Sequence, residues 1–309
     1  MTDKTLRIGT RGSRLALVQA EYVKSRLLTV HDNLEVEIEV VSTRGDRSQR
    51  ENIALSEIGG KGLFTLEIEE KLLSGDFDMA VHSAKDMPTA LPDGLELICF
   101  TERENVADAF ISDKFSSFED LSQGAVVGSA SLRRRALMWR KRPDLKMVMF
   151  RGNVDTRLQK IRDGVADATL LAHAGLKRLE LLQAITCDLP LDEFPPAPGQ
   201  GAITIEARSG NSNVAELLAP LNHKETELAL TAERAFLEVL DGSCRTPIGA
   251  HATLNGDVLS LHGIILKPDG SEFHEYWLDG TADDAFAIGQ GMGEYLRRKA
   301  GDRFFEDWV

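Results

Sequence analysis

Serine and arginine side chains gather at three points where an apolar run gives way to a helix-forming pattern. The segments are residues 128–135 (GSASLRRR), 151–157 (RGNVDTR) and 174–179 (AGLKRL). Such a turn exposes backbone N–H groups and the positive end of a helix dipole, and arginine adds charge-assisted hydrogen bonds. Three of them at one edge of a sheet predict a site for several anions. The candidate ligands are Ser129, Ser131, Arg133, Arg134, Arg151, Arg157 and Arg178.

The distribution of charge supports an anionic ligand. The chain of 309 residues has a net charge of −13, but residues 131–162 hold eleven basic and two acidic side chains, a local charge of +9. A nucleic acid is the competing interpretation of this basic segment. Aromatic residues make up only 6% of the chain, and no recognised nucleic-acid motif is present, which disfavours that interpretation.

A carboxylate follows another predicted strand. In residues 80–88 (AVHSAKDMP) the strand runs into Lys85 and Asp86, and Pro88 ends the segment. Open α/β sheets bind ligands just beyond the carboxyl ends of their strands. A carboxylate there can accept N–H donors or stabilise a cation. A surface ion pair of small energetic value explains the spacing equally well.

Two glycine-containing turns carry weaker signals. Arg11 and Ser13 follow the first predicted strand, where Ser13 is a plausible N-cap and its neighbouring amides suit an anion; a simple helix cap is the alternative. Lys61 lies in the glycine-rich segment 59–62, which matches neither a P-loop nor a dinucleotide-binding fingerprint. That segment is predicted to be a lid or an ordinary loop.

One of the three cysteines is a candidate for chemistry. Cys244 lies in a loop bounded by glycine and proline beside Arg245, a cation that favours the thiolate, although an inert loop cysteine remains the alternative. Cys99, inside an apolar strand, is predicted to be buried, and Cys187 to be structural. His251 is seven residues from Cys244, so no Cys/His dyad is evident.

The remaining sequence signals concern compartment and metals. Charged residues interrupt the N-terminal segment, no apolar run is long enough to span a bilayer, and three cysteines are too few for a disulfide framework. The histidines show no metal-binding spacing. We therefore expect a cytoplasmic protein without a metal, a membrane association or a nucleic-acid partner.

The elements that position these residues alternate between strand and helix. Strands are predicted at residues 6–10, 35–41, 78–82, 95–100, 125–128, 146–150, 168–172 and 202–206, and helices at 15–28, 62–73, 132–142 and 154–162. This rhythm predicts an α/β fold. After a long helix at 224–240 come strands at 250–254, 258–266 and 272–278 and a helix at 282–298, the pattern of a small α+β domain.

The ordered set of motifs resembles the porphobilinogen deaminase family over essentially the whole chain. The resemblance rests on residues 7–13 (RIGTRGS), 59–64 (GGKGLF), 80–88, 131–134 (SLRR), 151–158 (RGNVDTRL), 174–179, 196–201 (PAPGQG) and 242–249 (GSCRTPIG). Two small departures, Ser243 and Glu180 in place of glycine, touch no residue with a direct chemical role.

The resemblance implies an enzyme that joins four porphobilinogen molecules head to tail, with loss of ammonia, to give hydroxymethylbilane. The chain grows on a dipyrromethane cofactor held by a thioether to Cys244. Asp86 corresponds to the catalytic carboxylate that stabilises the cationic azafulvene. The remaining implied ligands of cofactor or substrate carboxylates are Arg11, Ser13, Lys61, Lys85, Ser129, Ser131, Arg133, Arg134, Arg151, Arg157 and Arg178, with Phe64 in a lid and Gln200 at the lobe crossover.

The family also implies an architecture. Two lobes resembling periplasmic binding proteins are expected at residues 1–101 with 202–219 and at 102–201, followed by a small C-terminal α+β domain at 220–309, in a monomer. A solute-binding or ligand-sensing module of the same two-lobe architecture is the rival hypothesis, because a fold does not fix a function. The absence of an evident export signal and of a DNA-binding motif disfavours it.

Overall fold

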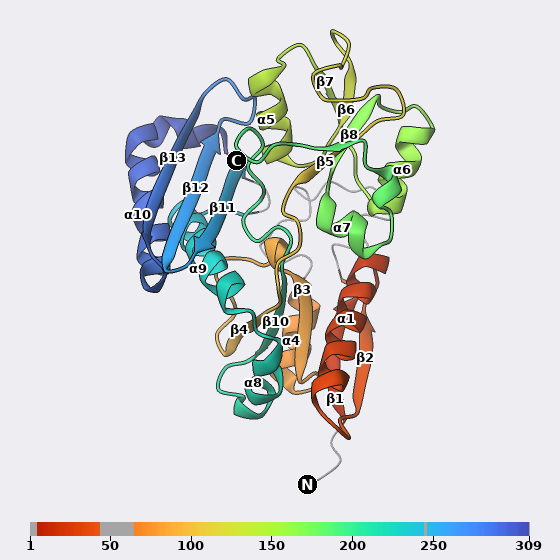
Figure 1. The fold of residues 1–309 in the computed structure, drawn as a ribbon, viewed down its shortest axis with the longest axis vertical. Helices are drawn as coiled ribbons and strands as arrows, with labels where there is room; N and C mark the ends of the chain where they lie inside the picture. Colours follow the sequence, from red (N-terminus) through yellow and green to blue (C-terminus); the bar gives the residue numbers. More distant parts are fainter. Residues whose placement is uncertain (1–4, 44–64, 244–245, 309) are drawn as a thin grey trace. The chain divides into compact units, whose positions relative to one another are not determined.

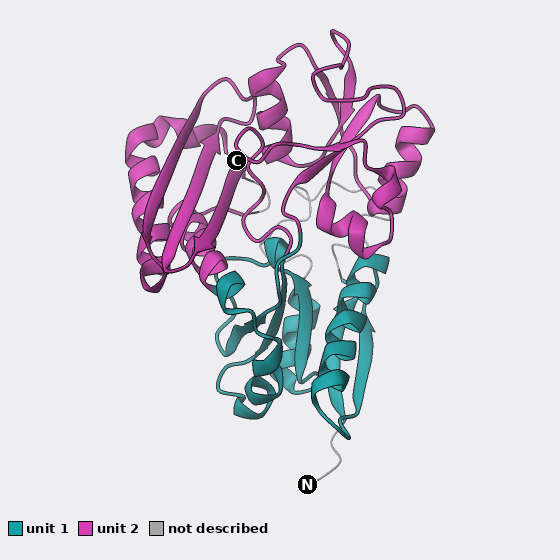
Figure 2. Ribbon diagram, viewed as in Figure 1, with its two compact units in different colours: residues 1–104, 202–227 teal, residues 105–201, 228–309 magenta. Residues whose placement is uncertain are grey.

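The computed structural model describes residues 5–43, 65–243 and 246–308. The chain divides into two compact units, coloured in Figure 2: unit 1 comprises residues 1–104 and 202–227, and unit 2 residues 105–201 and 228–309. The chain therefore passes between the units three times. Each unit contains a five-stranded sheet, and unit 2 contains a further sheet of three strands.

The sheet of unit 1 is mixed. Its strands, in spatial order, are β2 (Val36–Val41), β1 (Leu6–Arg11), β3 (Met79–Ser83), β10 (Ile203–Arg208) and β4 (Leu95–Phe100). Strands β1, β2 and β3 run parallel, whereas β10 is antiparallel to both of its neighbours. The helical elements are α1 (Arg14–Val30), α4 (Leu66–Ser74), η1 (Ala84–Asp86), α8 (Ser212–Leu218) and η3 (Ala219–Leu221). The carboxyl ends of β1 and β3 consequently lie at the same edge.

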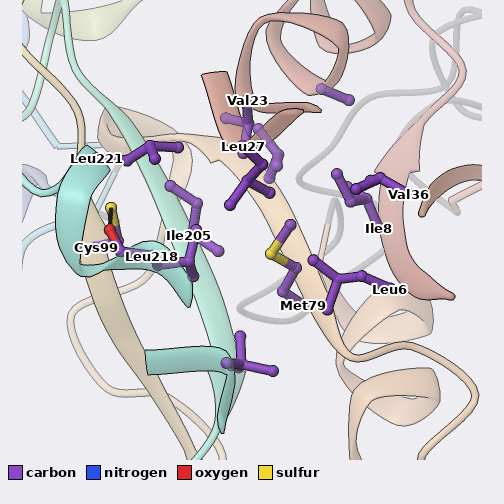
Figure 3. Close-up of a cluster of buried hydrophobic side chains, with 14 of the residues drawn as sticks. Leu6, Ile8, Val23, Leu27, Val36, Met79, Cys99, Ile205, Leu218 and Leu221 are labelled. Atoms are coloured by element: carbon purple, nitrogen blue, oxygen red, sulfur yellow. Dashed lines mark hydrogen bonds between the residues drawn. The ribbon is translucent and has the colours of Figure 1, made fainter. Parts of the chain in front are cut away.

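One face of this sheet is covered by apolar side chains of α1. Val23 and Leu27 of the helix pack in one buried cluster with Ile8, Met79 and Ile205 of three neighbouring strands (Figure 3). The helix begins at Ser13, whose side chain accepts a hydrogen bond from the Ala16 amide at 3.2 Å. The turn between β1 and α1 is thereby held in place against the core.

Cys99 belongs to the same cluster, as the sequence predicts. Its side chain is fully buried, and Figure 3 shows it beside Leu218, whose carbonyl oxygen lies 3.8 Å from the thiol sulfur. Burial raises the pKa of the Cys99 thiol to about 12. A thiol in this environment is a packing residue and not a nucleophile.

The five-stranded sheet of unit 2 repeats the parallel arrangement. Its order is β7 (Lys146–Val148), β6 (Val126–Gly128), β8 (Ala168–Ala172), β5 (Asp108–Ile111) and β9 (Cys187–Asp188). Strand β6 is parallel to β7 and β8, and β5 is antiparallel to β8. The helical elements are α5 (Leu132–Lys141), α6 (Val154–Arg162), α7 (His173–Arg178) and η2 (Leu182–Ala184). Each of the three helices follows the carboxyl end of a parallel strand.

The C-terminal part of unit 2 is an antiparallel sheet with helices. It contains β11 (Ile248–Asn255), β12 (Val258–Leu266), β13 (Phe273–Thr281), η4 (Ala282–Asp284), α10 (Ala285–Ala300) and η5 (Asp302–Asp307), and it follows α9 (Lys224–Val239) (Figure 1). At Gly289 a Cβ atom would lie 2.2 Å from the Ala232 carbonyl oxygen, so the glycine allows α10 to approach α9 closely. Ile264 and Leu266 of β12 also join the core beneath α5.

These sheets confirm the predicted fold class, α/β with a smaller C-terminal α+β part. The predicted helix at residues 154–162 and the predicted strand at residues 168–172 match α6 and β8 in their bounds. Strands β5 and β9 were absent from the prediction, and the polar segment at 209–213 contains the start of α8. The division into three domains stays a prediction.

The described residues offer neither a membrane-spanning helix nor a cluster of metal ligands. Within residues 5–43, 65–243 and 246–308, no helix has the length and apolar character needed to cross a bilayer. The same part of the chain contains no cluster of three or more histidine, cysteine, aspartate or glutamate side chains suited to a metal ion.

Candidate functional site

The first group of candidate residues lies at one edge of the unit 1 sheet. Arg11 ends β1, and Lys85 and Asp86 form η1 directly after β3. Because Ile8 pairs with Met79 in parallel register, the two strand ends lie next to each other. The structure therefore places Arg11, at the end of β1, and Asp86, which follows β3, at the same edge of the sheet.

A pocket is present at this edge. Its wall includes Arg11, Ser13, Gln19, Ser83 and Asp86. Asp86 is exposed, whereas Lys85 is half-buried. Gln19 is buried on α1 and bonds to Ser83, with its Nε2 at 2.9 Å from the serine Oγ. Gln19 and Ser83 are not among the site residues predicted from the sequence, although a glutamine on the apolar face of a predicted helix is a detectable signal.

The second group lies at the edge of the unit 2 sheet where β6, β7 and β8 end. Ser129 is buried, and its Oγ accepts a hydrogen bond from the Ser131 amide at 3.2 Å. Ser131 caps α5 by accepting from the Arg134 amide at 3.4 Å. At Gly128 a Cβ atom would lie 2.4 Å from the ring of Phe150, so the turn requires glycine. The prediction of a tight strand-to-helix turn here is confirmed.

Arg133 and Arg134 are buried around a carboxylate that the sequence analysis did not single out. Asp108 is fully buried at the start of β5; its Oδ2 lies 2.8 Å from Arg133 and its Oδ1 2.7 Å from Arg134. Arg133 also donates to the Pro195 carbonyl at 2.7 Å, and Gln200 donates to Asp108 at 2.9 Å. Two guanidinium groups face one carboxylate, so the cluster carries an excess positive charge.

The electrostatics of this cluster follow from its geometry. Burial by itself would raise the pKa of Asp108, but the guanidinium groups of Arg133 and Arg134 outweigh burial and hold that pKa well below its usual range. Burial lowers the pKa of Arg133, and Asp108 opposes that effect. The signal that could have found Asp108 is its position as the one charged residue in the apolar run 106–111.

The other predicted arginines lie at the two remaining turns of this edge. Arg157, in the first turns of α6, donates from Nε to the Gly152 carbonyl at 2.9 Å. Arg151 precedes α6, and its carbonyl accepts from Lys160. Arg178, in α7, donates to the Gly201 carbonyl at 2.6 Å. All three side chains are half-buried. The structure thus brings the three basic turns to one edge, where the sequence placed them.

Three predicted site residues lie outside the described residues: Lys61, Phe64 and Cys244. The predicted roles of these residues stay predictions. Cys187, expected to be structural, is half-buried in β9, and burial raises the pKa of its thiol.

Comparison with known sequences identifies the family. A sequence model described as porphobilinogen deaminase, dipyromethane cofactor binding domain, matches residues 6–216, and one described as porphobilinogen deaminase, C-terminal domain, matches residues 227–298. The chain belongs to the porphobilinogen deaminase family. A porphobilinogen deaminase of Nitrobacter hamburgensis is 51% identical over 306 residues, which cover 98% of this chain and 96% of the relative.

Solved structures with similar folds include binding proteins. A nutrient binding protein from Burkholderia cenocepacia, bound to methionine, has 13% identity and a TM-score of 0.44, with 70% of this chain and 90% of that chain covered. The periplasmic aliphatic sulphonate binding protein SsuA from Escherichia coli has 15% identity and a TM-score of 0.42, with 76% and 70% covered.

As a porphobilinogen deaminase, the enzyme polymerises porphobilinogen to hydroxymethylbilane in tetrapyrrole biosynthesis and uses a dipyrromethane cofactor. When bound, the cofactor supplies the pyrrole to which substrate units are joined. Its acetate and propionate groups need cationic partners, because a buried carboxylate without one costs several kcal/mol. The edge of the unit 2 sheet, with helix N-termini and an excess of guanidinium groups, fits such a group.

Proposed function

We propose that Asp86 is the catalytic carboxylate of this deaminase. The observation that carries the proposal is its position: an exposed carboxylate that lines the unit 1 pocket together with Arg11 and Ser13. An anion there accepts pyrrole N–H groups and stabilises the cationic azafulvene that forms as ammonia leaves. Arg11 and Ser13 supply donors for a carboxylate of the same substrate molecule.

The cationic edge of unit 2 holds the carboxylates of cofactor and substrate in this proposal. Arg151, Arg157 and Arg178 are half-buried and bind carboxylates directly, with Ser131 as a further donor. Arg133 and Arg134, which already bond to Asp108, supply the excess positive charge beneath that edge. Ser129 and Gln200 are further ligands in unit 2, and Lys85 is a further ligand in unit 1. Lys61 and Phe64 are also substrate ligands in this proposal.

The proposed role of Asp86 is tested with Asp86→Asn, which keeps the shape of the side chain and removes its charge. We expect kcat to fall by at least about 100-fold, because electrostatic stabilisation of a developing charge contributes on this scale. Asp93→Asn is the matched control, since Asp93 is exposed in the same unit and outside the pocket. A loss of less than about tenfold, or 1.4 kcal/mol of barrier, would remove Asp86 from the centre of the reaction.

We propose that the dipyrromethane cofactor is attached covalently to Cys244, and intact-protein mass spectrometry tests this attachment. The purified wild-type chain should carry an added mass of dipyrromethane size, and Cys244→Ser should lack it, whereas Cys187→Ser should retain it. An active enzyme with an unmodified mass would contradict the proposal. This measurement does not depend on turnover, so it separates cofactor loading from catalysis.

We also propose that the enzyme works as a cytoplasmic monomer that binds neither membranes nor nucleic acids. The net charge of −13 disfavours diffuse binding to polyanions and keeps the chain soluble. Sedimentation equilibrium should give a single species near 34.0 kDa. A stable dimer in that experiment would exclude the monomer.

A further inference from the structure

A cluster of titratable side chains lies buried in unit 1 next to the Asp86 pocket. Glu69 of α4, His82 of β3 and Glu206 of β10 are 4%, 6% and 0% exposed. His82 also contributes to the pocket wall that Asp86 helps to form. Burying two carboxyl groups and an imidazole is costly unless they are paired and hydrogen-bonded, and ionisable groups in such surroundings cluster at functional sites. The roles proposed above use none of the three.

The geometry fixes the orientation of the imidazole ring. Nε2 of His82 lies 3.1 Å from Oε2 of Glu206, across the antiparallel pair of β3 and β10. An ionised carboxylate can only accept a hydrogen bond, so Nε2 carries the hydrogen in this pair. The other ring nitrogen, Nδ1, has no hydrogen bond to any residue that the structure describes. Its lone pair is the part of the ring that is free to take up a proton.

The charged groups around the ring come from four elements. Glu206 lies on β10, Glu69 on α4, Asp86 in η1 and Arg11 at the end of β1. One carboxyl oxygen of Glu69 and one of Glu206, Oε1 in both, are buried and have no hydrogen bond to any residue in the described part of the chain. Burial raises the pKa of Glu69, and the negative charge of Glu206 adds to that effect. Glu69 therefore takes up a proton more readily than an exposed glutamate.

We propose that His82 is the proton acceptor of the polymerisation reaction, with Glu206 as the positioning residue that orients its ring. The proposal rests on the assignment of the Asp86 pocket as the site of chemistry. In each addition the C–N bond of one porphobilinogen breaks, and its electron pair leaves with ammonia. A C–C bond forms to the α-carbon of the accepting pyrrole. That carbon then releases its hydrogen as a proton to Nδ1 of His82, and the departing ammonia takes the same proton away as ammonium, so the ring returns to its starting state.

The first test replaces the ring with an amide. In His82→Gln the amide nitrogen can still donate to Glu206, but the side chain no longer accepts a proton at neutral pH. We expect kcat to fall by at least about 100-fold, which lies in the range typical of general base catalysis, and KM to change little. His31→Gln is the matched control, because His31 lies in the same unit and its Nε2 bonds to the Leu217 carbonyl at 2.7 Å, outside the pocket.

The second test uses readouts that a merely structural role would not move. In Glu206→Gln the imidazolium loses its anionic partner, so the acidic limb of the kcat–pH profile should move to lower pH. Long-range ¹H–¹⁵N spectra of the wild-type protein should show the neutral His82 ring with hydrogen on Nε2 and not on Nδ1. This spectrum needs no substrate and is independent of activity.

The outcomes separate this proposal from the role of Asp86. If Asp86→Asn abolishes turnover while His82→Gln keeps wild-type kcat, His82 is not the proton acceptor and the Asp86 assignment stands. If Asp86→Asn keeps its activity, the Asp86 assignment fails whatever His82 does. Hydrogen on Nδ1 of the neutral ring, or an unmoved pH profile in Glu206→Gln, overturns the proposal for His82 and Glu206.

Discussion

The two five-stranded sheets use the same strand-edge architecture but bury opposite charges beneath it. In unit 2, two arginines surround one carboxylate, Asp108, and hold its pKa below the usual range. In unit 1, two glutamates flank one imidazole, His82, and the pKa of Glu69 is raised. The sign of the excess buried charge decides which ligands each sheet edge can bind. The basic edge suits carboxylates, and the acidic edge suits protons and cations.

The largest effect is expected at the basic cluster. Asp108→Asn leaves two buried guanidinium groups without their anion, and we expect a loss of about 3–5 kcal/mol in the free energy of unfolding. Asp144→Asn breaks the partly exposed pair with Arg142 in the same unit and should cost much less, because solvent screens that pair. Urea unfolding at neutral pH provides the comparison. Equal losses in the two variants would show that Asp108 is not the anchor of the cluster.

The two clusters should also differ in the pH dependence of stability. Because the folded pKa of Asp108 is lowered, its contribution is present above the unfolded value, near 4, and is lost as the pH falls below it. Because the folded pKa of Glu69 is raised, its contribution is full below the unfolded value and is lost as the pH rises through the folded one. The contribution of Asp108 to the free energy of unfolding therefore rises with pH, whereas that of Glu69 falls with pH.

Glu69→Gln measures how the contribution of Glu69 to stability changes with pH. The stability of this variant relative to the wild type should increase as the pH rises from 4 towards neutrality. The reason is that ionisation of the buried Glu69 carboxyl, whose folded pKa is raised, destabilises only the wild type. Glu70→Gln is the control, since Glu70 is an exposed neighbour on α4. Urea unfolding curves of the two variants and the wild type at several pH values give the stability differences. A stability difference that stays constant over this range would contradict a raised pKa in the folded protein.

The smallest effect should be alike in the two units. Ser13 and Ser131 each cap a helix through their Oγ atoms, at 3.2 and 3.4 Å from the amide three residues later. Ser13→Ala and Ser131→Ala should each lower the free energy of unfolding by about 1 kcal/mol, and threonine at either position should restore most of it. A loss confined to one unit, measured by thermal unfolding, would show that only that cap matters for stability.

Local patterns were sufficient to predict most helices and strands. Leu95–Phe100 and Val154–Arg162 match their predicted bounds because the apolar spacing and the Asn153 cap act over a few residues. Strand β5 was missed because it is only four residues long and a buried Asp108 begins it. Helix α8 was missed because its cap, Asn211, lies in a segment whose composition is equally typical of a loop.

In the candidate site, too, the local features could be predicted from the sequence, whereas the long-range partners could not. The sequence predicted which turns carry arginine and which strand ends in Asp86, because strand, glycine turn and helix N-terminus are contiguous. It did not predict that Arg134 meets Asp108, 26 residues away, or that His82 meets Glu206, 124 residues away. Those pairs depend on which strands become neighbours and in which register.

By itself, then, the sequence determined the family, the separation of a basic segment from an acidic chain, and the kinds of chemistry available at each turn. The tertiary structure decided which charges are buried and with whom. Two arginines adjacent in the sequence are buried around Asp108 with an excess positive charge, and a histidine within an apolar strand has a carboxylate that orients its ring. Burial sets the cost of a charge and strand register sets its partner, and neither quantity is contained in a local run of residues.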